Sequence, residues 1–144
     1  MGYFMTRKKN KVIRGLDSLV EPFKSEIENL INILERDPQT KILEVFETAR
    51  SYERQKWLVA KKRSKTLRSK HLVGCACDFV PKGVDGWSWG DRDVNRSGSS
   101  KDEERAFYRM REIIQDYFPN LKFLGEWDLA HVELVDRLMP SKKV

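Results

Sequence analysis

The chain has 144 residues, enough for one domain that buries about two-thirds of its surface without disulfides or structural metals. Hydrophobic residues make up 40% and charged residues 35%, and no apolar run approaches the roughly 20 residues of a membrane-spanning helix. The net charge of +6 favours an anionic partner. Nucleic acid, an anionic membrane surface and a bacterial wall all qualify, so charge does not choose between them.

The N-terminal segment is basic, and no apolar stretch of signal-peptide length follows it. We therefore expect a basic arm over residues 1–15, a domain over residues 16–144, and synthesis in the cytoplasm without an export signal. The two cysteines form a Cys-x-Cys pair at positions 75 and 77, too close in sequence for a disulfide that would join distant parts of the fold. Such cysteine usage suits a reducing compartment.

The first half of the chain predicts two helices and two strands. From Leu16 the apolar residues recur at helical spacing, with Pro22 in the first turn, and Asp37-Pro38 ends this helix. Residues 41–49 are apolar and β-branched and predict a strand, and Ser51 caps a second helix over residues 52–62. Residues 74–80 predict a buried strand that Pro81 ends.

The second half begins with the one long loop, residues 82–100, which is rich in Gly, Ser and Asp. Trp87 and Trp89 either line a substrate cleft there or anchor the loop. A third helix follows over about residues 101–118, with an apolar face made of Ala106, Phe107, Met110, Ile113, Ile114, Tyr117 and Phe118. Short strands are predicted around residues 121–124 and 130–135. Three helices with a small, mainly antiparallel sheet make a single-domain α+β fold.

Both histidines lie in apolar, strand-like segments, each with an acidic residue at a useful distance. His71, Asp78 and His131 offer two imidazoles and one carboxylate, a set that suits catalytic zinc with one position left for water. On the predicted strand, Asp78 faces this site while Cys75 and Cys77 face the core. Spacing alone leaves two alternatives open: ordinary packing of the histidines, and a cysteine thiolate as a ligand.

Residues 61–70, KKRSKTLRSK, contain six basic side chains and no acidic one. This run is either a solvated helix end, a surface attracted to an anionic wall, or a nucleic-acid contact. A small basic nucleic-acid-binding domain is therefore an alternative class of function. That alternative leaves the two histidines and their acidic partners unexplained.

Two motifs of the chain resemble one known family. The first is Ser69-x-His71-x-x-Gly74-x-Ala76-x-Asp78, and the second is Trp127-Asp128-x-x-His131-x-Glu133-Leu134. Both are similar to motifs of the zinc peptidases of the D-alanyl-D-alanine carboxypeptidase and L-alanyl-D-glutamate endopeptidase superfamily, above all the peptidoglycan-cleaving endolysins of phages and prophages. Upstream, Ala49-Arg50-Ser51-x-x-x-Gln55 resembles the arginine–serine–glutamine motif of that family, and Lys65-Thr66-x-x-Ser69 resembles the approach to its first ligand. The resemblance runs from about Leu16 to Leu134.

The resemblance implies a metal centre and a proton carrier. His71, Asp78 and His131 would bind Zn²⁺, so that residues 16–144 form a zinc peptidase domain. Asp128, three residues before the last ligand, falls on the catalytic acid of the family, which is Glu or Asp. Glu126 is a nearby competitor for this role. Water activated by the metal would attack the peptide carbonyl.

The resemblance also implies a substrate and its contacts. Arg50 would steady the substrate or its developing negative charge, and Gln55 and Ser69 would line or support the site. The implied activity is an L-alanyl-D-glutamate endopeptidase acting on the peptidoglycan stem peptide, with a D-alanyl-D-alanine carboxypeptidase as the alternative. We expect a monomer without a nucleic-acid partner that reaches the bacterial cell wall through a separate membrane-permeabilising protein.

Overall fold

An antiparallel sheet forms the centre of the structure, a computed structural model that describes residues 10–83, 86–87 and 101–140. Four strands follow each other in the order β1-β2-β5-β4, and β3 pairs with the far end of β2. Their bounds are Leu43–Glu47 (β1), Ala76–Gly83 (β2), Gly86–Trp87 (β3), Leu121–Phe123 (β4) and His131–Leu134 (β5). The sheet and its helices confirm the predicted α+β class.

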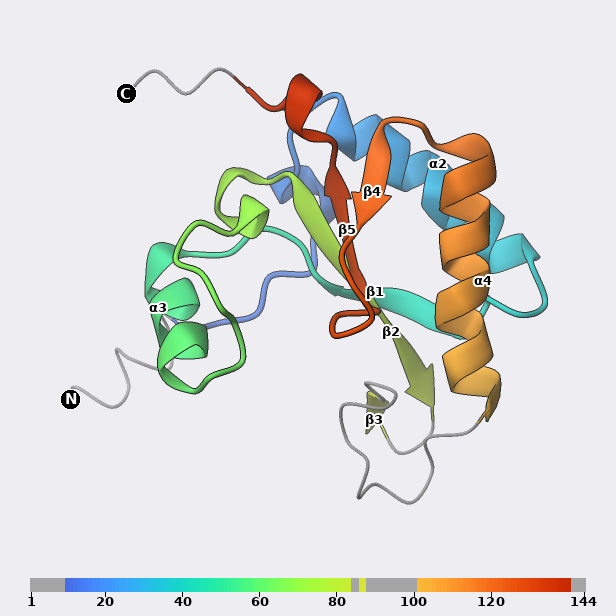
Figure 1. Cartoon of the computed structure of the whole chain (residues 1–144), viewed down its shortest axis with the longest axis horizontal. Helices are drawn as coiled ribbons and strands as arrows, with labels where there is room; N and C mark the ends of the chain where they lie inside the picture. The colour runs from blue at the N-terminus through green and yellow to red at the C-terminus, as the bar shows by residue number, and fades with distance from the viewer. Residues whose placement is uncertain (1–9, 84–85, 88–100, 141–144) are drawn as a thin grey trace.

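Two helices, α2 (Phe23–Arg36) and α4 (Lys101–Tyr117), lie on one side of the sheet, and α3 (Tyr52–Ala60) lies on the other (Figure 1). Ser51 caps α3 as predicted, because its side chain accepts a hydrogen bond from the Arg54 amide at 3.1 Å. Three 3₁₀ turns complete the described elements: η1 (Leu16–Ser18), η2 (Lys70–Val73) and η4 (Asp136–Leu138).

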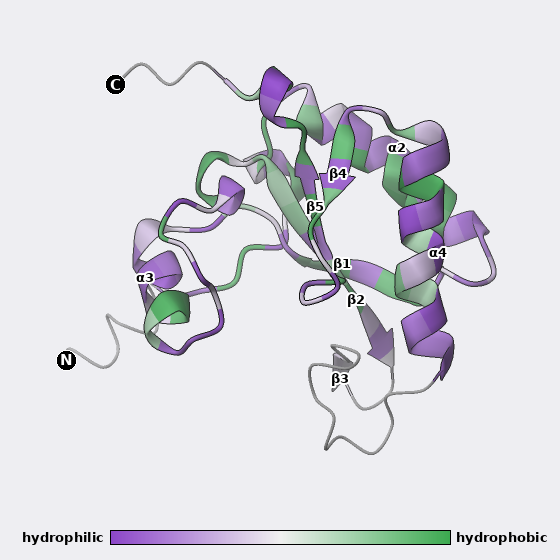
Figure 2. Ribbon diagram, in the orientation of Figure 1, coloured by the Kyte–Doolittle hydropathy of each residue, from purple (hydrophilic) through white to green (hydrophobic). Residues whose placement is uncertain are grey.

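The core lies between the sheet and the pair α2 and α4. Hydrophobic residues gather where these elements face one another, whereas the segment after α3 is mainly hydrophilic (Figure 2). The two helices bury Phe23, Ile27, Leu30, Leu34, Ala106, Phe107, Met110, Ile113 and Ile114, and β2 and β5 add Cys77, Phe79, Val132 and Leu134. Cys75, just before β2, is buried in the same cluster, so both cysteines pack in the core as predicted.

The first helix begins later than the apolar spacing from Leu16 suggests, although Pro22 lies at its start as predicted. Residues 16–18 form only a 3₁₀ turn, Leu19 is extended, and α2 begins at Phe23 with Pro22 as its N-cap residue. A residue before proline avoids the helical region, and proline has no N–H to donate, so the helix cannot continue through this point. Instead, the amide of Val20 donates to the carbonyl of Gly74 at 3.1 Å, which joins this segment to the turn that leads into β2.

Two other expectations also differ from the structure. Pro81 does not end β2, which continues to Gly83. The amide of Lys82 donates to the carbonyl oxygen of Ile42, the residue just before β1. The nitrogen of Pro81 therefore faces away from β1, on the edge of β2 where the pairing with β5 has already ended. Tyr117 is 68% exposed and does not belong to the apolar face of α4. Trp87 packs edge-on against Phe46 with ring centroids 5.1 Å apart, whereas Trp89 lies outside the described residues.

Part of the predicted basic arm contacts the domain. The amide of Thr48 donates to Ile13 at 2.7 Å, and Arg54 donates to the Asn10 side chain at 2.9 Å. Residues 1–9 lie outside the described residues, so the division at residue 15 stays a prediction. Of the helices that the structure describes, none has the length and apolar character needed to span a membrane.

Candidate metal centre and cleft

Strand register places two of the three candidate ligands side by side. Asp78 on β2 lies directly opposite His131 on β5. Side chains at directly opposed positions of antiparallel strands point to the same face, with Cβ atoms about 5 Å apart. Alternation along β5 puts Glu133 on this face as well, while Val132 and Leu134 point into the core.

The third candidate, His71, belongs to η2, and a glycine shapes the turn between η2 and β2. Gly74 has a φ of 71°, the left-handed conformation that favours glycine. A Cβ at this position would also lie 2.6 Å from the Ser18 carbonyl oxygen, so a larger residue would push the turn away from the N-terminal segment. The Ser69 hydroxyl caps η2 and accepts a hydrogen bond from the His71 amide at 3.2 Å. Ser69 therefore positions His71.

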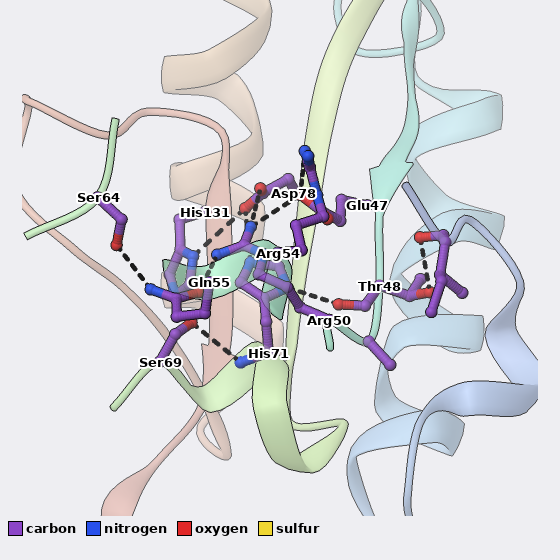
Figure 3. A network of polar contacts seen from close by, with 12 residues as sticks. Glu47, Thr48, Arg50, Arg54, Gln55, Ser64, Ser69, His71, Asp78 and His131 are labelled. Atoms are coloured by element: carbon purple, nitrogen blue, oxygen red, sulfur yellow. Dashed lines mark hydrogen bonds and ion pairs between the residues drawn. The ribbon is translucent and has the colours of Figure 1, made fainter. Parts of the chain in front are cut away.

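The three side chains converge on one point at the bottom of a cleft (Figure 3). Asp78 Oδ1 lies 3.2 Å from His71 Nε2 and 3.3 Å from His131 Nδ1. All three potential ligand atoms lie within 4.8 Å of one another, and all three residues are buried. The structure thus brings together the predicted set of two imidazoles and one carboxylate.

In each histidine, the ring nitrogen that faces away from the candidate metal position contacts an oxygen atom, and this contact orients the ring. His71 Nδ1 contacts the Thr48 carbonyl oxygen at 2.5 Å, and His131 Nε2 contacts Glu133 Oε1 at 2.8 Å. Carbonyl and carboxylate oxygens only accept, so these nitrogens carry protons, and in the neutral imidazole the opposite ring nitrogen is the one that offers a lone pair to a metal. Metal-ligating histidines are oriented in this way by partners outside the ligand set. The residues present therefore fit a zinc ion.

The neighbouring opposite charges in this cluster shift the pKa values of its members. Burial raises the pKa of Asp78, but the two histidines outweigh burial and hold that pKa well below its usual range. Burial lowers the pKa of His131, but hydrogen bonds with Asp78 and Glu133 raise it to about 9. Burial raises the pKa of Glu133, yet His131 and Lys70 lower it to about 2. Without metal, His131 is therefore protonated at neutral pH.

The cysteines are not part of this cluster. Both point into the core, and burial raises the pKa of each thiol, so the thiolate form that binds metal is disfavoured. Of the acidic, histidine and cysteine side chains that the structure describes, only His71, Asp78 and His131 form a group with metal-binding spacing. This geometry argues against the thiolate alternative that spacing alone left open.

A β-bulge in β1 links Arg50 to the candidate metal centre. Between Val45 and Glu47 the register with β2 shifts, which brings Glu47 opposite Asp78. Arg50 Nη2 lies 2.8 Å from Glu47 and 3.6 Å from Asp78 Oδ2. Arg54 also pairs with the buried Glu47 carboxylate. The guanidinium of Arg50 thus lies beside the candidate ligand and within the lining of the cleft.

Gln55 connects Arg50 to the basic segment after α3. Its Oε1 accepts from Arg50 at 2.8 Å, and its Nε2 donates to the Ser64 hydroxyl at 2.9 Å and to the Thr66 carbonyl oxygen. Gln55 is fully buried, so its role in this structure is support for the cleft wall.

The turn before β5 carries the candidate proton carrier. Asp128 is half-buried and lines the cleft, and its charge helps to raise the pKa of His131. Glu126 is exposed and is not among the residues that line the cleft. The buried Arg111 of α4 donates to the carbonyl oxygens of Gly125 at 2.9 Å and of Asp128 at 3.4 Å. This geometry favours Asp128 over Glu126.

The cleft has a volume of about 920 Å³, and Arg54, Trp57 and Leu58 of α3 are among the residues that line it. Its floor holds the three candidate ligands, and the basic segment 62–70 and the Trp127 side chain line its walls. Trp127 is 50% exposed and its indole lies under the ammonium group of Lys65, 4.6 Å from nitrogen to ring centroid.

Sequence reasoning missed three partners of the predicted site. Glu133 belongs to the second motif and follows His131 by two residues, so both side chains lie on the same face of the strand. The alternation of side chains along a strand could therefore have identified Glu133 as a partner of His131. Glu47 depends on the bulge in β1, and no sequence pattern reveals that bulge. Thr48 acts through its backbone carbonyl oxygen, which any residue would supply.

Comparisons with known proteins give one informative result. No family model matches the sequence, and no curated protein matches it either. Among solved structures, the chain resembles the crystal structure of Serratia marcescens L-Ala D-Glu endopeptidase ChiX, with a TM-score of 0.58 and 22% sequence identity. The match covers 91% of this chain and 95% of that chain. At this identity the two proteins share a fold, and any shared activity has to be argued from the site.

Proposed function

We propose that this protein is a zinc-dependent peptidoglycan peptidase that cleaves the stem peptide between L-alanine and D-glutamate. The single observation that carries the proposal is the convergence of His71 Nε2, Asp78 and His131 Nδ1 at the floor of a cleft. The solved structure of similar fold is an endopeptidase for the L-Ala D-Glu bond, which supports this choice of substrate.

The chemistry follows from the side chains around the centre. When bound, zinc would supply a Lewis acid and would lower the pKa of water at the centre to about 7. The Asp128 carboxylate accepts the proton of the attacking water and returns it to the leaving amine, a role worth about 10²–10⁴-fold in rate. The neighbouring Trp127 side chain also lines the cleft.

Arg50 supplies fixed positive charge where negative charge develops. Its Nη2 lies 3.6 Å from Asp78, so the guanidinium lies next to the metal position without entering the ligand set. Glu47 and Gln55 hold it in one geometry, and a donor held in advance costs no reorganisation during the reaction. Arg50 would therefore stabilise the oxyanion of the tetrahedral state.

We further propose a phage or prophage endolysin role. The protein would be made in the cytoplasm of the host and act on the cell wall after a separate protein permeabilises the membrane. The resemblance of the two histidine motifs to endolysins supports this role.

Metal content and cleavage test the proposal together. Elemental analysis of the purified protein should give one zinc per chain, and a synthetic peptide with an L-Ala-D-Glu bond should be cut at that bond. His131→Ala should lose both the tight zinc and the activity, whereas Cys75→Ala should keep the zinc. One zinc per chain in His131→Ala would contradict the ligand set, and loss of zinc in Cys75→Ala would restore the thiolate alternative.

A further inference from the structure

The wall of the cleft that follows α3 carries four exposed cations. Lys62, Arg63, Lys65 and Arg68 are all exposed and all line the cleft. The basic run at residues 61–70 has two further cations, which differ from these four. Lys61 does not line the cleft, and Lys70 pairs with Glu133 and Asp136. The sequence alone left open whether this run is merely a solvated surface.

The positive charges of these four side chains are not paired with carboxylates of the described residues. The other cations of the cleft have carboxylate partners: Arg50 and Arg54 share Glu47, and Lys70 pairs with Glu133 and Asp136. Within residues 10–83, 86–87 and 101–140, no carboxylate forms an ion pair with the four wall cations. Their positive field therefore points into the cleft, and an anionic group of a ligand is the partner that it fits.

The wall is held at a fixed distance from the metal centre. Gln55 binds the backbone and side chain of residues 64–66 on one side and Arg50 on the other, and Arg50 contacts Asp78. The ammonium group of Lys65 lies over the Trp127 ring, on the turn that carries Asp128. Lys65 thus lies close to the reacting groups, and a carboxylate bound there would lie beside the bond being cut.

We infer that the segment Lys62–Arg68 is a carboxylate-recognition wall that selects substrates with a free carboxylate next to the scissile bond. This inference rests on the proposed function. A D-glutamate residue has two carboxyl groups and its chain linkage uses one, so the other is free beside the bond to L-alanine. Lysine and arginine bind such a group by charge-assisted hydrogen bonds. The amidated form of the same residue has no charge to bind.

Two peptides that differ only at this group test the inference. One has the free D-glutamate carboxylate and the other has its amide, and kcat and KM are measured for both. The wild type should prefer the free peptide by about tenfold in kcat/KM, mainly through KM, because each exposed charge pair contributes about 1.5- to 5-fold. Lys65→Gln/Arg68→Gln should lose this preference. Lys61→Gln removes the charge of a neighbour outside the cleft and should retain it.

Each result decides the question. Equal kcat/KM for both peptides, or an equal loss of preference in Lys61→Gln and in the double variant, would overturn the wall and leave the peptidase intact. If neither peptide is cut, the proposed function fails, and calorimetry on the zinc-loaded protein tests the wall by itself. Tighter binding of the free peptide that disappears in the double variant would support it. Equal affinity for both peptides, or displacement of the free peptide by a short single-stranded DNA, would overturn it.

Discussion

Glu133 offers a prediction whose magnitude follows from the structure. Its Oε1 accepts the Nε2 proton of His131 at 2.8 Å, and its Oε2 lies 2.7 Å from Lys70. Glu133→Gln retains the size and one acceptor oxygen but removes the charge. Hydrogen bonds to charged groups contribute about 1.5–3 kcal/mol, and loss of such an outer partner lowers metal affinity by about 10- to 100-fold. The two estimates agree, since about 1.4 kcal/mol corresponds to tenfold.

The measured loss of zinc affinity in Glu133→Gln depends on pH. Glu133 also raises the pKa of His131, which reaches about 9 in the metal-free protein, so at neutral pH a proton competes with zinc. Removal of the charge weakens that competitor as well, and the two effects partly cancel at pH 7. At pH 9 the competition fades. We therefore expect Glu133→Gln to lower zinc affinity by about tenfold at pH 9, and by less at pH 7.

The assay is competition against a chromophoric zinc chelator at both pH values. Asp136→Asn is the matched control, because Asp136 contacts the same Lys70 and Lys122 but no candidate ligand. It should change zinc affinity less than about twofold, as expected for an exposed ion pair. Equal zinc affinity of Glu133→Gln and wild type at pH 9, or an equal loss in Asp136→Asn, would refute the reasoning.

Three further predictions concern the proton carrier, the metal-linked proton and the turn before β5. Asp128→Asn should retain zinc and lose about 10²–10⁴-fold in kcat, whereas Glu126→Gln should stay within about twofold in the same peptide assay; the reverse pattern would move the base to Glu126. Because the raised pKa of His131 keeps it protonated at pH 7 and a ligand must be neutral, zinc binding should release a proton and tighten as pH rises towards about 9. Calorimetry in two buffers of different ionisation enthalpy measures this proton, and zinc binding without proton release would contradict it. Arg111→Met removes the hydrogen bonds to the Gly125 and Asp128 carbonyl oxygens and should lower kcat while zinc affinity stays unchanged, with partial recovery in Arg111→Lys; an unchanged kcat in folded Arg111→Met would contradict the role of the turn.

Part of the candidate ligand set was predictable from short-range pattern. Period-two alternation in residues 74–80 assigned Asp78 to one face and the cysteines to the other, and the structure confirms both assignments. The motif resemblance then joined His71 and His131 to Asp78, although they lie far apart in sequence. Strand register, which only the structure provides, supplies the contact between Asp78 and His131.

The errors arise where long-range contacts override local pattern. Helical spacing from Leu16 was real, but the hydrogen bond between Val20 and Gly74 holds that segment outside the helix. Pro81 seemed to end a strand because proline lacks an N–H, yet its nitrogen faces away from β1, and the pairing of β2 with β5 covers only Ala76 to Asp78. The partners of Arg50 were also hidden, since they depend on the bulge that brings Glu47 opposite Asp78.

The most direct test of the proposed activity is mass spectrometry of purified Gram-negative peptidoglycan after incubation with the zinc-loaded protein, with and without a chelator. We predict fragments with a new amino end at D-glutamate that disappear when the chelator is present. Loss of terminal D-alanine alone would make the protein a carboxypeptidase instead. Intact peptidoglycan after incubation with protein that carries one zinc per chain would contradict the proposed function.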